Sequence, residues 1–332
     1  MEYKISTYDL KLIKHIFSMT ETSLVKSLPK VLDAYYEKKD IIATNDFIYV
    51  KGDIPIALVA HLDTVHRQVV RVLYHDEKKG VLWSPQGLGA DDRAGVFAIL
   101  KILEAGYRPS VIFCTQEESG GTGAREFIKK FNRPAVKTNF LIELDRRGIN
   151  DSVYYDFDNP LFEEYINNYG FVTDWGSFTD ISIISPHWRL PAVNLSTGYL
   201  NEHTLSETLH YCSLYQTIEK VKRILDAEMT VDHIFEYKEI NYDNDFFFRR
   251  FGSFWGNSNN SGSMLACDLC GFTYSKSAMT PVVEHNCTFN ICPDCVRDNI
   301  SWCAKCGRGY LGFFEDDPDA VSGLCSECKG EH

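Results

Sequence analysis

Between residues 40 and 228, short apolar segments alternate with amphipathic ones, and this alternation most constrains the fold. Apolar runs typical of strands occupy 46–50, 56–63, 110–115 and 139–145, and helical periodicity occupies 94–106, 123–131 and 205–229. Such alternation predicts parallel strands with helices on both faces of the sheet. Because the first ~35 residues also show helical spacing, we expect an α/β domain with three layers and a mostly parallel sheet.

The composition changes after the last predicted helix. Residues 245–263 pass from clustered aromatic residues into a Ser/Asn/Gly stretch, which is typical of a flexible linker. A chain of 332 residues can hold one large core and a smaller module. We therefore predict an α/β domain at 1–240, a linker at 241–263 and a small cysteine-rich domain at 264–332.

Charge and hydropathy limit the classes of partner. The formal net charge of −12 argues against nucleic acid, because phosphate binding depends on Lys and Arg. The N-terminus mixes charges into its apolar residues and lacks the apolar core of a signal peptide. No apolar run approaches the ~20 residues needed to cross a bilayer. The sequence therefore predicts a cytoplasmic protein that binds neither membranes nor nucleic acid.

Candidate metal ligands follow the predicted strands. Side chains alternate faces along a strand, so His61 and Asp63 project to the same side at the C-terminal end of 56–63. In open α/β sheets, ligands bind at this edge. Further ligand-type side chains lie at strand ends or in adjoining loops: Asp91 in "GLGADDRAG", Glu117 and Glu118 in "TQEESGGTGA", Asp145 in "NFLIELD" and His203 in "GYLNEHT". We expect all of them to meet at one edge of the sheet.

These residue types suit a pair of metal ions. Adjacent carboxylates such as Glu117 and Glu118 repel each other unless a cation holds them. Two imidazoles with three or more carboxylates suit two zinc ions that share one carboxylate, and cobalt or manganese could replace zinc. Paired metals polarise a carbonyl group and activate water, so hydrolysis of an amide is the expected chemistry.

The motifs "HLD", "GADDRAG", "TQEESGGTGA", "ELD" and "GYLNEHT" occur in this order along the chain. The series resembles that of the co-catalytic di-zinc exopeptidases, which include peptidase T and the glutamyl and leucyl aminopeptidases. The resemblance covers roughly residues 40–228, and the ordered set is far more specific than any one motif. It implies a zinc aminopeptidase-like fold for this part of the chain.

The resemblance also implies a role for each residue of the set. It implies these metal ligands: Asp91 as the bridge, His61 and Asp145 for one ion, and Glu118 and His203 for the other. It further implies that Glu117 is the general base, that Asp63 orients His61, and that the Asp91–Asp92 peptide bond is cis. Three histidines outside the motifs are interpreted as ordinary loop or surface residues: His66, His75 and His187.

One departure separates this chain from peptidase T. Members like peptidase T and the carboxypeptidases insert a lid and dimerisation domain between the motifs matching Asp145 and His203, but only 57 residues separate them here. A domain of roughly 100 residues does not fit there. We therefore expect a lidless, aminopeptidase-like domain. Lidless relatives often have a Ser-Asp near the substrate pocket; Asp180 lies at that position, and a helix or turn cap is the alternative.

The sequence predicts a metallo-exopeptidase, most simply an aminopeptidase that hydrolyses a peptide or amino-acid amide. By the resemblance, a hydroxide that bridges the two metals would attack the carbonyl group, with Glu117 as general base. The alternative is a peptidase-like binding protein with little or no activity, whose tail recognises a protein partner. Glu117 favours the enzyme, because an inactive protein has no need of its base.

Four Cys-x-x-Cys pairs mark the C-terminal region: Cys267 and Cys270, Cys292 and Cys295, Cys303 and Cys306, and Cys325 and Cys328. Eight thiolates suffice for two closed structural zinc sites, and the glycine after the first and third pairs is typical of zinc-ribbon knuckles. Sequential pairing predicts two ribbons; crossed pairing, or substitution by His285 or Cys287, is the alternative. From residue 264 on, ten acidic residues outnumber five basic ones, so we expect a module that docks protein.

Overall fold

The computed structural model describes residues 4–155, 159–176 and 178–238, together with short segments between residues 264 and 311. The chain divides into two compact units, Met1–Phe246 and Phe247–His332. This division falls within the segment that the sequence suggests as a linker. The exact domain limits stay predictions.

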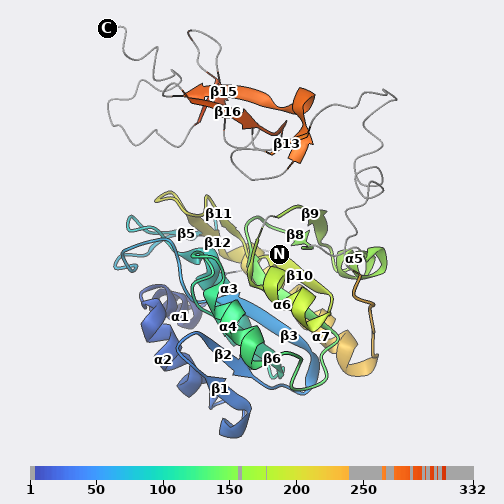
Figure 1. Ribbon diagram of the computed structural model, residues 1–332. Coiled ribbons are helices and arrows are strands. Elements are labelled where there is room, and N and C mark those ends of the chain that lie inside the picture. The colour runs from blue at the N-terminus through green and yellow to red at the C-terminus, as the bar shows by residue number, and fades with distance from the viewer. Residues whose placement is uncertain are drawn as a thin grey trace. The chain divides into compact units, whose positions relative to one another are not determined.

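An eight-stranded sheet forms the centre of the first unit (Figure 1). Its spatial order is β1 (Ile41–Ala43), β2 (Phe47–Val50), β6 (Pro109–Cys114), β3 (Ile54–His61), β7 (Phe140–Arg146), β10 (Ala192–Ser196), β8 (Asp151–Val153) and β9 (Val172–Asp174). Strands β6, β3, β7 and β10 run parallel to one another, whereas β2 and β8 pair antiparallel with β6 and β10. The sheet is therefore parallel at its centre and changes direction towards its edges.

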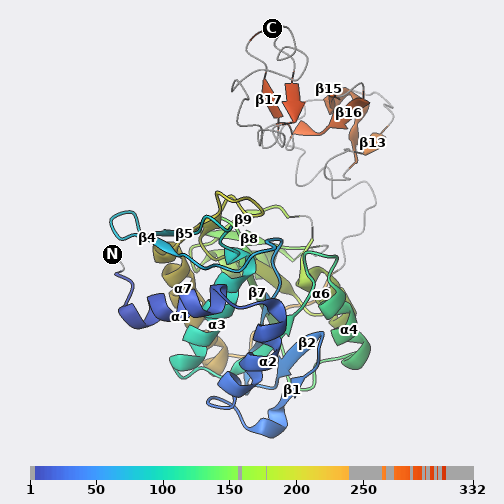
Figure 2. The ribbon, with the colours of Figure 1, turned by 90° about the vertical axis from the view of Figure 1, so that its left-hand side faces the viewer.

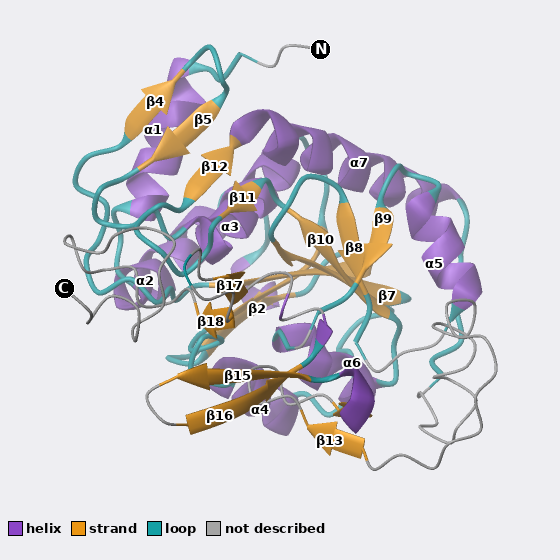
Figure 3. Cartoon of the chain, turned by 90° about the horizontal axis from the view of Figure 1, so that it is seen from above, coloured by secondary structure: helices purple, strands orange, loops and turns teal. Residues whose placement is uncertain are grey.

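Helices cover both faces of this sheet, as Figures 1 and 3 show. The described helices of the first unit are α1 (Thr7–Phe17), α2 (Glu21–Leu32), α3 (Ala90–Glu104), α4 (Thr122–Lys130), α5 (Pro160–Asn167), α6 (Asp180–Trp188), α7 (Tyr211–Thr230) and the 3-10 turn η1 (Lys38–Asp40). In β3, Leu58 belongs to the core formed with α3 and α7, whereas its neighbour Val59 belongs to the core formed with α4 and α6. Because strand side chains alternate, both faces of β3 must be apolar. The predicted three-layer α/β fold is confirmed.

The helical spacing of the first ~35 residues corresponds to α1 and α2. Each helix has a side-chain cap: Ser6 accepts a hydrogen bond from the Asp9 N–H, and Thr20 accepts one from the Ser23 N–H. Helix α1 packs against α3, which carries part of the candidate site (Figure 2). Across the described residues, no helix combines the length and apolar character needed to cross a membrane.

A second, four-stranded sheet is not anticipated by the sequence pattern. Its order is β11 (Tyr199–Leu200), β12 (Thr208–His210), β5 (Val81–Trp83) and β4 (Tyr74–Asp76). The helix predicted at 205–229 is therefore wrong over its first residues: α7 begins at Tyr211 because β12 pairs with β5 and buries Leu209. This pairing places the segment that follows His203 against α3.

The described parts of the second unit are antiparallel strand pairs. They comprise β13 (Met264–Ala266) with β14 (Thr273–Ser275), β15 (Thr280–Glu284) with β16 (Cys287–Ile291), β17 (Ile300–Trp302) with β18 (Gly309–Leu311), and the 3-10 turn η2 (Lys276–Ala278). In the sequence, the first Cys-x-x-Cys pair falls between β13 and β14, and the third between β17 and β18. Of the eight predicted zinc ligands, only Cys292 lies among the described residues, where it is buried. The predicted zinc sites and their pairing thus lie outside the described residues.

Candidate metal centre

The candidate ligands meet where three adjacent parallel strands end. Strand β3 ends at His61, its neighbour β7 carries Asp145 next to its last residue, and Glu117 follows the end of β6. Neighbouring parallel strands present their C-terminal ends at one edge of the sheet, which is where ligands bind in such folds. Asp63 lies beyond the end of β3, so strand alternation does not set its direction. The hydrogen bonds that its carboxylate accepts from the Glu117 and Glu118 turn set the direction of the Asp63 side chain instead.

Asp91 lies between the two histidines. The Nε2 atom of His61 is 3.1 Å from Oδ1 of Asp91, and Nε2 of His203 is 3.2 Å from Oδ2. The same nitrogen of His61 is 3.5 Å from Asp145, and that of His203 is 3.0 Å from Glu118. Each histidine thus shares Asp91 and has a second carboxylate of its own. The structure brings together the two sets that the resemblance implies.

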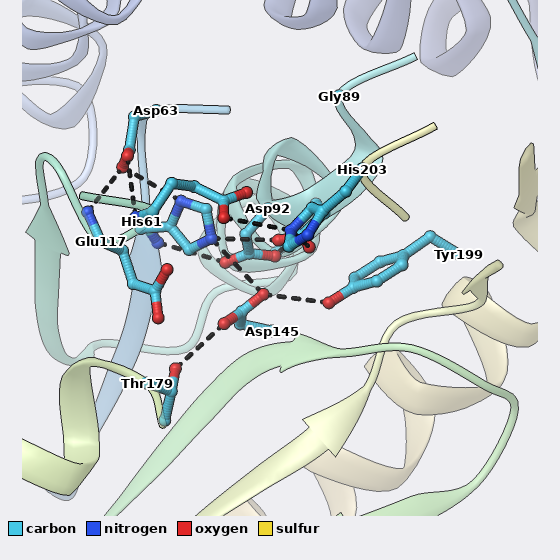
Figure 4. Close-up of polar contacts among 12 residues, drawn as sticks. His61, Asp63, Gly89, Asp92, Glu117, Asp145, Thr179, Tyr199 and His203 are labelled. Atoms are coloured by element: carbon cyan, nitrogen blue, oxygen red, sulfur yellow. Dashed lines mark hydrogen bonds and ion pairs between the residues drawn. The ribbon is translucent and has the colours of Figure 1, made fainter. Parts of the chain in front are cut away.

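Asp63 fixes the turn that carries the two adjacent glutamates (Figure 4). Its Oδ1 accepts a hydrogen bond from the Glu117 N–H at 3.0 Å, and its Oδ2 accepts one from the Glu118 N–H at 3.1 Å. Oδ1 also lies 3.2 Å from Nδ1 of His61. Asp63 therefore orients the histidine and the glutamate turn together. Among the residues drawn in Figure 4, no hydrogen bond or ion pair reaches the Glu117 carboxyl group, so this group is not tied to a protein partner.

Asp145 is held by residues that the sequence analysis does not identify. Thr179 donates a hydrogen bond to its Oδ2 at 3.0 Å, and the Tyr199 hydroxyl donates to its Oδ1 at 3.1 Å (Figure 4). Asn194 on β10 accepts from the Asp145 N–H at 2.9 Å and donates to the Asp145 carbonyl at 2.6 Å. These partners come from three separate segments and match no ligand motif. The role of Asn194 can be recognised only once the pairing of β7 with β10 is known.

Asp92 lies close to the candidate ligands, but the backbone engages its carboxylate. Two groups of ligand atoms fall within 4.8 Å of one another: His61, Asp92 and Asp145, and His61, Asp91 and Glu118. Yet Asp92 Oδ2 accepts from the His61 N–H at 3.2 Å, and Oδ1 accepts from the Gly95 N–H at 3.0 Å. The Asp91–Asp92 peptide bond is cis, as the resemblance implies. Asp92 therefore supports His61 and the first turn of α3.

The electrostatics of the histidines reflect the carboxylates around them. Burial by itself lowers the pKa of His61, but Asp145 and the neighbouring aspartates raise that pKa well above its usual value. Hydrogen bonds with Asp91 and Glu118 raise the pKa of His203 to about 11. In the absence of bound cations, protons on the two imidazoles therefore balance part of the carboxylate charge.

The same residues fit divalent cations. Burial, followed by the neighbouring carboxylates, raises the pKa of Glu117 to about 9. Within the described part of the chain, the buried Oε1 atom of Glu118 makes no hydrogen bond. The cluster contains imidazoles and a larger number of carboxylates, and one carboxylate oxygen has no hydrogen-bond donor. This is the donor set that two zinc, cobalt or manganese ions require.

Metal affinity is expected to rise with pH. A metal needs neutral imidazoles, whereas the raised pKa values of His61 and His203 keep both protonated at neutral pH when no metal is bound. Each proton released should therefore lower the apparent Kd about tenfold per pH unit below the raised pKa. Zinc titrations at pH 6, 7 and 8, with proton release followed by calorimetry in two buffers, measure this slope. A Kd that is the same at all three pH values contradicts the protonated cluster.

His66 lies in a loop, as the sequence analysis interprets it, but its side chain is not on the surface. Its side chain is only 8 % exposed, and its Nε2 lies 2.8 Å from the fully buried carboxylate of Glu207. Glu207 itself escaped the sequence analysis because it fell inside the segment predicted as helix. The sequence feature that could have identified Glu207 is its position as an acidic residue four positions after His203, in the same loop.

Asp180 lies at the first position of α6 and is buried. Thr179 caps this helix through a capping box with Ser182, so the helix-cap reading does not depend on the Asp180 side chain. Burial raises the pKa of Asp180 to about 7. A contact between Asp180 and substrate stays a prediction, and it would require this carboxyl group to be reached from the site side of the helix.

Comparison with known proteins identifies the segment that carries most of these residues. Residues 49–171 match the model of Peptidase family M28. Over this segment, which is less than half of the chain, the protein is similar to Peptidase family M28. The matched segment contains His61, Asp91, Glu117, Glu118 and Asp145 and ends before His203. No curated protein shows a significant match to the chain.

Solved structures share the fold of the first unit. Aminopeptidase PepT from Bacillus cereus ATCC 10987 aligns with 67 % of this chain and 98 % of its own, with 14 % sequence identity and a TM-score of 0.52. A tripeptidase from Staphylococcus aureus subsp. aureus Mu50 aligns with 68 % of this chain and 99 % of its own, with 14 % identity and a TM-score of 0.51. These likenesses show the fold. With the M28 match, they confirm the resemblance to the di-zinc exopeptidases and support a metallo-exopeptidase.

The expected absence of a lid agrees with the described elements between Asp145 and His203. Strands β8, β9 and β10 of this segment join the main sheet, β11 joins the second sheet, and α5 and α6 pack on the main sheet. The described residues between the two motifs thus contain no separate domain.

Proposed function

We propose that the protein is an aminopeptidase, a metal-dependent hydrolase that removes an N-terminal residue from a peptide or cleaves an amino-acid amide. The observation that carries this proposal is the position of Asp91, whose two carboxylate oxygens face His61 and His203 respectively. Asp145 would complete the site of His61, and Glu118 that of His203. Two zinc ions suit these ligands best, with cobalt or manganese as alternatives.

The side chains around this centre have different roles in hydrolysis. When bound, the two metal ions supply Lewis acidity for the scissile carbonyl group and for the attacking water. Glu117 accepts the proton of that water and returns it to the leaving amine. Cations beside Glu117 lower the pKa of its carboxyl group, so that it can act as a base near neutral pH. Asp63 holds the Glu117 backbone and His61 in fixed relation throughout.

The charge of the centre favours substrates with a free amino terminus. Carboxylates outnumber imidazoles there, and Asp145 and Asp180 lie near enough to raise the pKa of Glu117. An ammonium group is attracted to such a site, whereas the terminal carboxylate of a carboxypeptidase substrate is repelled. The missing lid also removes the place where related carboxypeptidases hold that carboxylate. Both arguments support cleavage from the amino end.

A panel of amides tests the proposal. Protein loaded with zinc, cobalt or manganese is expected to hydrolyse leucine, alanine or glutamate amides. Its rate on the N-acetylated forms of these amides is expected to be about 100-fold lower. A chelator should abolish the activity, and readdition of metal should restore it. Preferential cleavage of the acetylated forms would instead assign an acyl-amino-acid hydrolase. No cleavage with any of the metals would favour a peptidase-like binding protein.

The tail, residues 264–332, carries the Cys-x-x-Cys pairs. We infer that its four Cys-x-x-Cys pairs hold two structural zinc ions, because a module of about 70 residues needs such support to fold. Its excess of acidic residues suits a basic surface on a protein partner or protein substrate. Zinc content distinguishes the two kinds of site: about four ions per chain are expected, of which Asp91→Ala should lose two.

A further inference from the structure

Glu207 is a fully buried carboxylate with three hydrogen-bonding neighbours. Its Oε2 accepts from the Gly89 N–H at 2.7 Å and lies 2.8 Å from Nε2 of His66. Its Oε1 accepts from the Asp91 N–H at 3.0 Å. A buried carboxylate with charge-assisted partners on both oxygens is held in one position and holds its partners in turn.

These neighbours belong to two different segments of the metal centre, and Glu207 comes from a third. His66 lies in the loop that follows β3, and the last residue of β3 is the candidate ligand His61. Gly89 and Asp91 lie at the start of α3, and Asp91 is the residue between the two histidines. Glu207 itself follows His203 by four residues. A single side chain therefore joins the loops that carry His61, Asp91 and His203.

The contact with Asp91 uses the start of α3. Asp91 and Asp92 have non-helical φ and ψ angles, so the backbone N–H groups at this entry to the helix lack the partners that a regular helix would provide. Gly89, the residue before this helix, has a φ of 65° and no side chain that could serve as a cap. Glu207 provides the cap from a distant segment instead. In doing so it fixes the backbone from which Asp91 projects.

His66 secures Glu207 from the other side. A Cβ atom at Gly87, where φ is 82°, would lie 2.2 Å from the His66 ring, so only glycine allows the ring to pack there. The imidazole can then reach Glu207 while its side chain stays 8 % exposed. Gly87 and His66 thus explain part of the "GLG" sequence that precedes the aspartates.

The geometry identifies Glu207 as a support and not as a ligand. Its oxygens are turned towards two backbone N–H groups and one imidazole, whereas the Asp91 carboxylate faces His61 and His203. The His203 site has the greater need of such support. His61 and Asp145 belong to the central strands β3 and β7, whereas His203 lies in a loop, with a φ of 64° and a side chain that is 51 % exposed.

We propose that Glu207 is a positioning residue that sets the distance between Asp91 and His203 and thereby the affinity of the metal site formed by Asp91, Glu118 and His203. This inference rests on the proposed di-metal function. Replacement by glutamine retains the size of the side chain but places an N–H₂ group where an oxygen now accepts, opposite a donor. The two loops should then separate, and the metal bound between them should be held less tightly.

The test is zinc binding by the full-length chain, measured by equilibrium dialysis and counted above the zinc retained by Asp91→Ala, which removes a ligand of both centre ions and so separates them from those of the tail. Glu207→Gln is expected to raise the Kd of one of these two ions by about 10–100-fold and to leave the other within about threefold. Cobalt substitution gives a second readout, because the visible absorption of one cobalt ion should be lost. The matched control is Glu202→Gln, which removes the pairing with Arg147 in the same loop and should leave both ions bound.

Each outcome decides the matter. Unchanged affinity for both ions in Glu207→Gln overturns the inference, as does an equal loss in Glu202→Gln. If wild type binds no zinc above the Asp91→Ala level, the proposed metal centre fails and this inference fails with it. If Glu207→Gln does not fold, His66→Asn replaces it, because this change keeps both backbone contacts of Glu207. The Kd of the same ion is then expected to rise by about three- to tenfold, on the order of half the effect of Glu207→Gln in free energy. Wild-type binding by folded His66→Asn overturns the inference.

Discussion

Glu117→Gln is expected to lower kcat by about 10²–10⁴-fold while leaving both zinc ions bound. Glutamine has the shape of glutamate but cannot accept the proton of the attacking water. Hydrogen bonds from the Glu117 and Glu118 backbone to Asp63 do not involve the changed group, so the turn should keep its position. Steady-state kinetics on the best amide of the panel, together with zinc content, measure the two expectations separately.

Two matched variants make this result specific. Glu118→Gln, next in the sequence, should lose activity together with one metal ion, because Glu118 faces His203 at 3.0 Å. Glu126→Gln removes an ion pair with Lys129 on the surface of α4 and should behave as wild type. Activity of zinc-loaded Glu117→Gln within threefold of wild type would falsify the assignment of Glu117 as the general base.

The layers of the fold could be predicted because its central strands are covered on both faces. Such strands are apolar throughout, and the helices between them carry clear periodicity. The second sheet escaped prediction for the opposite reason. Strands of two or three residues such as β11 and β12 are too short to show a period, and β12 stands directly before a long helix whose pattern extends into it. Only the pairing of β12 with β5 defines it as a strand.

The candidate ligands could be located because they follow recognisable strands or lie in the glycine-flanked motifs. Their supporting residues could not. Asn194 acts through strand pairing, Thr179 through a helix start, and Glu207 through the backbone of a loop more than 100 residues away in sequence. None of these contacts depends on a local spacing. Residues that hold a ligand are therefore found only when the fold has placed them.

The two halves of the centre differ in how they are built. His61 and Asp145 lie on neighbouring strands of the main sheet, and Asn194 and Tyr199 hold Asp145 in addition. Glu118 and His203 lie in a turn and a loop. A site on strands keeps its geometry when no metal is present, whereas a site on loops gains order from the ion itself. We therefore expect the His61 site to fill first in a zinc titration.

Asp91 belongs to both halves, and its replacement should have the largest effect on metal binding. In Asp91→Ala, both the His61 site and the His203 site lose a ligand, and activity is expected to fall to the level of the metal-free protein. Asp91→Asn keeps one oxygen and should retain one ion, since a single carbonyl oxygen cannot face both histidines. Zinc content and activity are measured for both variants beside Asp33→Asn, a change at the surface next to Lys38.

The expected pattern for Asp91 separates a bridging role from a structural one. A bridge requires that alanine removes two ions and asparagine removes one, with the thermal unfolding midpoint of the metal-free chains close to wild type. Loss of a single ion in both variants means that Asp91 serves one site only, and the centre then resembles a pair of independent metals. Retention of both ions in Asp91→Ala would remove the observation on which the two-metal reading rests, because no other described carboxylate contacts both histidines.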